Sequence, residues 1–71
     1  MTDTQELRNM ISKSGLRTDF ICSKLGVTYQ TLRRKINNES EFTASEISIM
    51  VELLHLSDNQ RNQIFFASEM N

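Results

Sequence analysis

Apolar residues recur with helical spacing along most of the chain. Leu7, Met10 and Ile11 stand at positions i, i+3 and i+4, and the same spacing returns over residues 47–54. Side chains with this period lie on one face of an α-helix, where they can meet a common core. The chain has no proline and two glycines, so few residues interrupt such helices. The pattern therefore predicts an all-α fold, in a single domain over residues 1–71.

Capping residues divide this pattern into five helices. Thr2, Asp3 and Thr4 are N-cap candidates, with Glu6 as a capping partner of Asp3, for a first helix over about residues 4–14, which Gly15 ends. Thr18 is expected to cap a short second helix, which Gly26 ends. Glycine is the residue that most often takes the left-handed conformation found at helix ends.

Three further helices are expected after Gly26. Thr28 caps the third helix, and residues 37–40 form a loop. Capping boxes, in which two side chains three residues apart satisfy each other's backbone N–H groups, precede the last two helices. They are Thr43 with Glu46 and Ser57 with Gln60. These two helices are expected over about residues 44–55 and 58–68.

Residues 18–37 join the second and third helices through a brief turn. Gly26 stands where the backbone must change direction, which favours a positive φ angle. Cys22, four residues earlier, is small enough to let the two helices approach. The apolar positions around the turn are Ile21, Leu25, Val27 and Leu32. This arrangement is typical of a helix-turn-helix, in which the second of the two helices enters the major groove of DNA.

These residues resemble the lambda-repressor-like, Cro/XRE-type helix-turn-helix regulators of bacteria and their phages. The resemblance is carried by Cys22, Leu25-Gly26, Thr28, Thr31-Leu32 and Lys35-Ile36-Asn37, and it continues at Phe42-Thr43, Glu46-Ile47 and Ile64-Phe65-Phe66. The chain differs at Asn38, where the family often has glycine, and at Cys22, where alanine is common. Asparagine tolerates left-handed backbone geometry, and cysteine is only slightly bulkier than alanine, so both differences are compatible with the fold. The resemblance covers about residues 5–66 and implies a five-helix DNA-binding domain that acts as a repressor of a phage or mobile element.

The polar side of the third helix is the expected reading surface. With Leu32 directed inward, Gln30, Arg33, Arg34 and Asn37 project to the opposite side of the helix. The side chains expected to reach base edges are Tyr29, Gln30, Arg33 and Arg34. Gln30 can pair bidentately with adenine, either arginine with guanine, and Tyr29 can pack on a thymine methyl group. The alternative is an ordinary solvated helix surface, since Gln and Arg are common on exposed helices.

Contacts with the DNA backbone are expected around this face. Thr28 can offer its hydroxyl and nearby backbone N–H groups to a phosphate. The resemblance implies that the start of the second helix and the end of the third hold the backbone on either side. The full set expected is Arg17, Thr18, Thr28, Lys35 and Asn37, of which Lys35 is a weaker candidate, as is Lys24.

Charges are unevenly distributed along the chain, although the net charge is −1. Residues 8–35 carry seven Lys and Arg residues and a single acid, Asp19. Residues 36–71 carry six acidic residues and one arginine, Arg61. A basic first half indicates a polyanionic partner such as double-stranded DNA. The alternative is that these charges belong to ordinary solvated helix faces.

The composition gives little support for catalysis. With one His and one Cys, the chain has no metal-ligand cluster, and it shows no catalytic triad or glycine-rich phosphate loop. We therefore expect no enzyme activity, no cofactor and no small-molecule substrate. No stretch approaches the roughly 20 apolar residues of a membrane helix, and no signal peptide is recognisable. A cytoplasmic protein without a membrane partner is expected, and the lone Cys22 fits a reducing compartment.

A homodimer on a palindromic operator is expected, because one small module covers only about 600–1,000 Å² on DNA. Two modules would read half-sites about 34 Å apart. The expected dimer contact is the C-terminal helix, with Phe65, Phe66 and Met70. Adjacent helical side chains point about 100° apart, so one ring can enter the core while the other stays exposed. The alternative places both rings in the core.

Two other functions are compatible with the same pattern. The fold can serve as a protein-interaction module, such as an antirepressor, inhibitor or adaptor that binds no DNA, and the acidic second half suits this reading. An antitoxin that binds its own operator is close to the repressor hypothesis but adds a protein partner. Salt-dependent binding to double-stranded DNA distinguishes a DNA reader from a module that binds protein alone.

Overall fold

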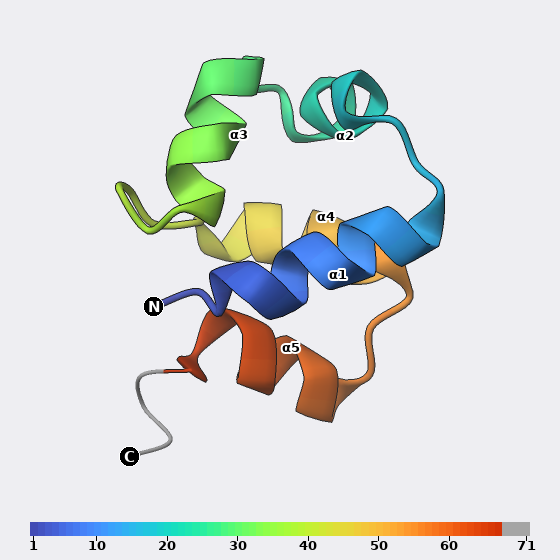
Figure 1. Ribbon diagram of the computed structural model, residues 1–71, viewed down its shortest axis with the longest axis vertical. Helices are drawn as coiled ribbons and strands as arrows, with labels where there is room; N and C mark the ends of the chain where they lie inside the picture. Colours follow the sequence, from blue (N-terminus) through green and yellow to red (C-terminus); the bar gives the residue numbers. More distant parts are fainter. Residues whose placement is uncertain (68–71) are drawn as a thin grey trace.

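The structure is a computed structural model that describes residues 1–67, and in this range it consists of five α-helices without a strand (Figure 1). They are α1 (Thr4–Ser14), α2 (Thr18–Leu25), α3 (Tyr29–Ile36), α4 (Ala44–Leu54) and α5 (Asp58–Phe65). The all-α fold expected from the sequence is confirmed. None of these five helices is long and apolar enough to cross a membrane. Met70, expected at a dimer contact, lies outside the described residues.

Side-chain caps start α1, α3, α4 and α5 as the sequence predicts. The capping residues are Asp3, Thr28, Thr43 and Ser57, and the last two form the expected capping boxes. α2 differs, because its N-cap is Arg17, which makes no side-chain cap hydrogen bond. The prediction that Thr18 caps α2 is therefore wrong. The N–H of Ile21 donates to the Arg17 carbonyl at 3.2 Å, so the helix already includes Thr18.

α4 ends at about its expected limit, whereas α5 ends before its own. α4 stops at Leu54, because His55 adopts a left-handed conformation with φ 55°. α5 ends at Phe65 and does not reach the expected limit at about residue 68. After the helix, the Ala67 N–H donates to the Met1 carbonyl at 3.1 Å. A contact with the start of the chain thus takes the place of a further helical turn.

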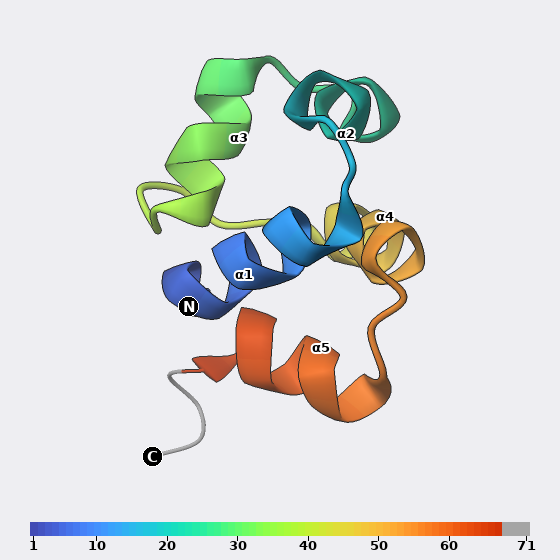
Figure 2. The ribbon, with the colours of Figure 1, turned by 45° about the vertical axis from the view of Figure 1, so that its right-hand side comes forward.

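One side chain from each helix meets at the centre of the molecule. These side chains are exposed by less than 2%, and they are Leu7, Ile21, Leu32, Met50 and Ile64. In both views α1 crosses the middle, with α2 and α3 at one end and α5 at the other (Figures 1 and 2). Because Leu32 anchors α3 in this core, the opposite side of α3 is turned to solvent.

Residues 1–3 connect α5 with the loop after α3. The backbone N–H and carbonyl of Thr2 pair with the side-chain amide of Asn38, at 2.7 Å in each case. The Asp3 N–H donates to the Ile64 carbonyl at 2.6 Å. Asn38 has φ 66°, the left-handed geometry expected at this position. The start of the chain thereby holds the loop that follows α3.

Candidate functional site

α3 exposes its polar side to solvent. Leu32, on its inner side, is 1% exposed, whereas Tyr29 is 60% exposed. Gln30, Arg33 and Arg34 are exposed as well. The four residues predicted to read bases therefore share an accessible helix surface. α3 contains no acidic residue, so this surface is cationic at neutral pH.

A short turn sets the direction of α3. Gly26 ends α2 with φ 72°, and its N–H donates to the Cys22 carbonyl at 2.8 Å. The Val27 N–H donates to the same carbonyl at 3.1 Å, which closes the end of α2. Thr28 is then extended and caps α3 with its hydroxyl. The axes of α2 and α3 consequently run in steeply different directions (Figure 1).

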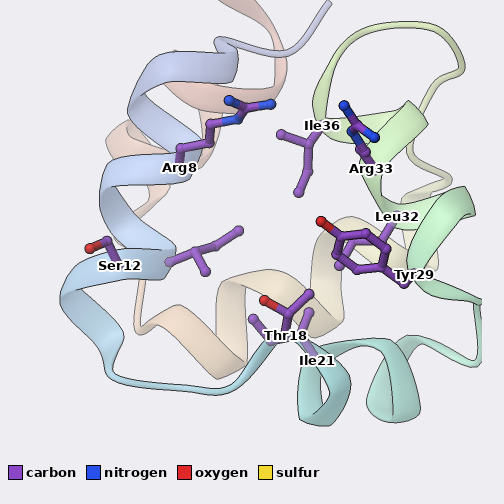
Figure 3. A pocket seen from close by; sticks show the side chains of 9 residues that line it. Arg8, Ser12, Thr18, Ile21, Tyr29, Leu32, Arg33 and Ile36 are labelled. Atoms are coloured by element: carbon purple, nitrogen blue, oxygen red, sulfur yellow. The ribbon is translucent and has the colours of Figure 1, made fainter.

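A hollow of about 560 Å³ lies between α1, α3 and the start of α2 (Figure 3). Its apolar lining is Ile11, Ile21, Leu32 and Ile36, and its polar lining is Arg8, Ser12, Thr18, Tyr29 and Arg33. Three residues predicted to contact DNA, namely Thr18, Tyr29 and Arg33, thus meet at one hollow although they come from two helices. Gln30 and Arg34 do not line it and lie farther around the outer side of α3.

Arg8 belongs to this group, although the sequence did not single it out. Its Nη2 atom donates to Oδ1 of Asn37 at 2.6 Å and so joins α1 to the residue that ends α3. Asn37, predicted at the DNA backbone, is half-buried. The partner of Arg8 lies 29 residues away in the chain, so local patterns could not reveal it. The sequence could have indicated Arg8 only through its position next to Leu7, at the edge of the buried face of α1.

Lys35 forms an enclosed ion pair instead of an exposed contact. Its Nζ atom lies 2.6 Å from Oε1 of Glu46 and 3.3 Å from the carbonyl of Glu41. The side chains of Lys35 and Glu46 are 11% and 12% exposed. The expected contact of Lys35 with the DNA backbone is therefore corrected, because its charge is matched within the protein. Lys35 joins α3 to the start of α4.

The surroundings of Glu46 lower the pKa of its carboxyl group. Burial acts to raise this pKa, but hydrogen bonds from Lys35 and from the Thr43 N–H, with the positive charge of Lys35, outweigh it. The Thr43 N–H donates to Oε1 of Glu46 at 2.9 Å, the same oxygen that faces Lys35. One carboxylate thus serves both the capping box of α4 and the link to α3.

Arg17 and Thr28, also expected at the DNA backbone, differ in whether their side chains are available to a phosphate. Arg17 lies 3.4 Å from Asp19, with side chains 85% and 78% exposed, and a pair so exposed contributes little. The Thr28 hydroxyl is occupied within the protein, because it accepts from the Thr31 N–H and donates to the Thr31 hydroxyl. At the start of α3, backbone N–H groups are therefore better placed than this hydroxyl to hold a phosphate.

Phe65 belongs to the core and not to the surface. It is 3% exposed, and its ring packs edge-to-face on Phe42 with 5.3 Å between ring centroids. The expected dimer contact through Phe65 is therefore corrected, since its ring is already used inside the domain. Phe66 is half-buried and keeps part of its surface available.

Cys22 is a packed core residue, 7% exposed. Burial, and then the negative charge of Asp19, raise the pKa of its thiol. The thiol is therefore protonated at neutral pH and is a poor nucleophile. Within residues 1–67, no group of three or more His, Cys, Asp or Glu side chains is placed to hold a metal ion.

Known proteins offer no direct guide to the function. The chain matches no protein-family model, no curated protein and no solved structure. Function is therefore inferred from the side chains that this chain exposes and from the way its helices hold them.

Proposed function

We propose that the protein is a sequence-specific DNA-binding regulator of the helix-turn-helix class, similar to the small Cro/XRE-type repressors. In this proposal α2 and α3 form the helix-turn-helix, and α3 enters the major groove, which at about 12 Å is wide enough for one helix. The observation that carries the proposal is the exposed face of α3, where Gln30, Arg33 and Arg34 stand on a helix that has no acidic residue.

The side chains on this face suit the edges of base pairs. A guanidinium group presents two parallel N–H donors, which match the two acceptors of guanine, so Arg33 or Arg34 can recognise that base. The amide of Gln30 combines a donor and an acceptor, which match adenine. Each such bidentate pair contributes about 1–3 kcal/mol of discrimination against the wrong base. A few contacts from one helix are therefore enough for sequence preference.

Cations on elements next to α3 also favour an orientation in which the α2–α3 end of the domain faces DNA. Arg8 on α1 lines the hollow beside α3, and Arg17 precedes α2. Most acidic residues of the described chain come after α3 and belong to α4, α5 and the connecting segments. This separation would steer the phosphate backbone toward the end of the molecule that carries α2 and α3. A net charge of −1 is therefore no obstacle to DNA binding.

The proposed regulator acts as a homodimer on a palindromic operator, because two linked modules gain the affinity that one small domain lacks. The half-buried ring of Phe66 is the remaining described candidate for the dimer contact. Sedimentation of the Phe66→Ala variant at micromolar concentration should give the mass of a monomer. A dimer mass equal to that of the wild type would exclude Phe66 from the contact.

A selection experiment tests DNA binding without knowledge of the operator. The purified protein is used to enrich duplexes from a random-sequence library, and its affinity for the enriched duplex is measured by fluorescence anisotropy at several salt concentrations. We expect one enriched sequence and a steep fall in affinity with salt. Gln30→Ala and Arg34→Ala should each relax the preference at particular base pairs.

The matched control for Gln30→Ala is Gln63→Ala, which removes an exposed glutamine from α5 at the other end of the molecule. This variant should keep both the affinity and the base preference of the wild type. If no sequence is enriched, and binding to duplexes of any sequence is undetectable at low salt, the proposed function is wrong.

A protein-interaction module is the second candidate, and the apolar lining of the hollow favours it. Ile11 and Ile36 line the hollow together with Leu32, and apolar side chains there could receive a side chain from a partner protein. Under this alternative the selection would fail, whereas substitution of Ile11 by a charged residue would abolish capture of the partner. Retained DNA binding in the same variant would favour the regulator.

A further inference from the structure

Two arginines from different helices line the hollow beside α3. Figure 3 shows Arg8 on the α1 wall of the hollow and Arg33 on the α3 wall, both near the upper end in this view, with Ile36 between them. The ion pairs of residues 1–67 involve neither arginine. Both positive charges border one hollow without an ion-pair partner among the described residues, so an anion bound beside them would be stabilised electrostatically.

Asn37 is held next to these groups in a defined orientation. The guanidinium group of Arg8 can only donate hydrogen bonds, so the atom of Asn37 that faces Nη2 at 2.6 Å is its amide oxygen. The amide NH₂ group of Asn37 is therefore directed away from Arg8. It makes no hydrogen bond to another part of the described chain. Arg8 and the amide NH₂ group of Asn37 thus present hydrogen-bond donors side by side.

We infer that Arg8 and Asn37 form a binding site for one phosphate of the DNA backbone, at the junction of α1 and the end of α3. The inference rests on the proposed function and adds to it a contact from α1, outside the α2–α3 unit. A phosphodiester offers acceptor oxygens only, which matches a site made of guanidinium and amide N–H groups. Arg8 both donates to the phosphate and positions the amide of Asn37 for the same ligand.

A polyanion suits this place better than a single acidic side chain of a protein. Arg33 and Arg34 are exposed on the adjoining surface of α3, and no described ion pair neutralises either of them. Successive phosphates of a duplex can satisfy several separated cations at once, whereas one carboxylate can satisfy one or two. The junction also lies beside the helix face proposed to enter the groove, where backbone phosphates line the edges.

The test compares Arg8→Gln with Lys13→Gln, which removes an exposed positive charge from the last turn of the same helix. Affinities for the selected duplex and for an unrelated duplex are measured by anisotropy over a range of salt concentrations. Arg8→Gln should weaken binding to both duplexes by about tenfold and reduce the log–log salt slope by about one, because one phosphate contact is lost. The ratio of the two affinities should stay unchanged. Lys13→Gln should change both affinities by less than about twofold, since Lys13 neither lines the hollow nor contacts Asn37.

Asn37→Asp provides an independent variant, because it replaces the two amide donors by a negative acceptor of the same shape. It should also weaken binding to both duplexes. A third readout uses selected duplexes in which one phosphate at a time is replaced by a neutral methylphosphonate. The wild type should lose affinity at several positions in each half-site, and at one of these positions Arg8→Gln should show no further loss.

Thermal unfolding of each variant separates a lost contact from a lost fold. If Arg8→Gln binds the selected duplex with the affinity and salt slope of the wild type, the inference is wrong and the proposed function stands. If it changes the preferred base pairs, Arg8 acts through α3 and the phosphate site is also wrong. Absence of any DNA binding by the wild type would overturn both. Arg8-dependent binding of a Glu-rich peptide, with DNA affinity unaffected by the substitution, would assign the site to a protein partner instead.

Discussion

The side-chain amide of Asn38 pairs with the backbone of Thr2 through two hydrogen bonds of 2.7 Å, one in each direction. The asparagine side chain satisfies both the N–H and the carbonyl of Thr2, as a paired backbone segment would, and it connects parts of the chain that are 36 residues apart. Asn37, the residue before it, bonds to Arg8 on α1. Two consecutive asparagines thus hold the end of α3 against the first residues of the domain.

Two replacements of Asn38 should separate the contribution of its side-chain hydrogen bonds from the cost of its left-handed backbone conformation. Asn38→Ala removes the two bonds to Thr2 and a third to the Thr4 hydroxyl, at 3.3 Å, and leaves a Cβ-bearing residue at φ 66°. We therefore expect a loss of about 2–4 kcal/mol in the free energy of unfolding. Asn38→Gly removes the same bonds but is free of the backbone strain, so its loss should be smaller by about 1 kcal/mol. Urea denaturation measures both. A glycine variant less stable than the alanine variant would contradict this account.

The Lys35–Glu46 pair should make stability depend on pH in the acid range. The folded state lowers the pKa of Glu46, so this carboxylate stabilises the fold above its unfolded pKa of about 4.3. The contribution is lost as the pH falls through the folded pKa. Glu46→Gln should lower the free energy of unfolding by about 1–3 kcal/mol at pH 7.

The difference between wild type and Glu46→Gln should shrink as the pH falls below about 4, which thermal unfolding between pH 3 and 7 can follow. Glutamine can still serve the capping box of α4, so the loss reports mainly on the charge. Glu52→Gln, at an exposed position of the same helix, is the control and should have little effect. A difference that stays constant over this pH range would contradict the prediction.

Gly15 and Gly26 offer a matched pair for the cost of a left-handed helix end. Both have φ 72°, and a Cβ added to either would meet no atom within 4 Å. Substitution by alanine should therefore cost only backbone strain, about 1–2 kcal/mol at each site. Chemical denaturation of the two single variants should give similar losses. A much larger loss for Gly26→Ala would reveal a role in the α2–α3 turn beyond its φ angle.

The thiol of Cys22 should react slowly with a disulfide reagent in the native protein. It is 7% exposed, and its pKa is raised by burial and by Asp19, so little thiolate is present at pH 8. Reaction with an aromatic disulfide, followed by absorbance, should become fast only after unfolding in urea. Native reactivity equal to that of a free thiol would show that α2 opens readily.

Local features of the fold could be predicted because their causes are local. A cap such as Thr43 with Glu46 involves residues three apart, and so the sequence alone indicates it. The positive φ of Gly26 follows from its place at a helix end. The end of α5 could not be predicted in the same way, because a hydrogen bond between Ala67 and Met1 accompanies it.

The residues of the candidate site on the outer face of α3 could be predicted from the sequence, whereas those whose partners lie on other helices could not. Periodicity places Gln30 and Arg34 on the outer face of that helix, as the structure has them. Lys35, next in sequence to two arginines, resembled part of the same basic surface, but its partner Glu46 begins another helix. Arg8 was missed for the same reason, since only the packing of α1 against α3 brings it to Asn37.

The five side chains that meet at the centre, one from each helix, leave no element able to detach alone without opening the interior. Unfolding in a single cooperative step is the natural consequence. A surface mounted on such a frame is already ordered before it meets a partner, so little conformational entropy is lost on contact. The solvent-exposed side of α3 would therefore bind a partner without first having to fold.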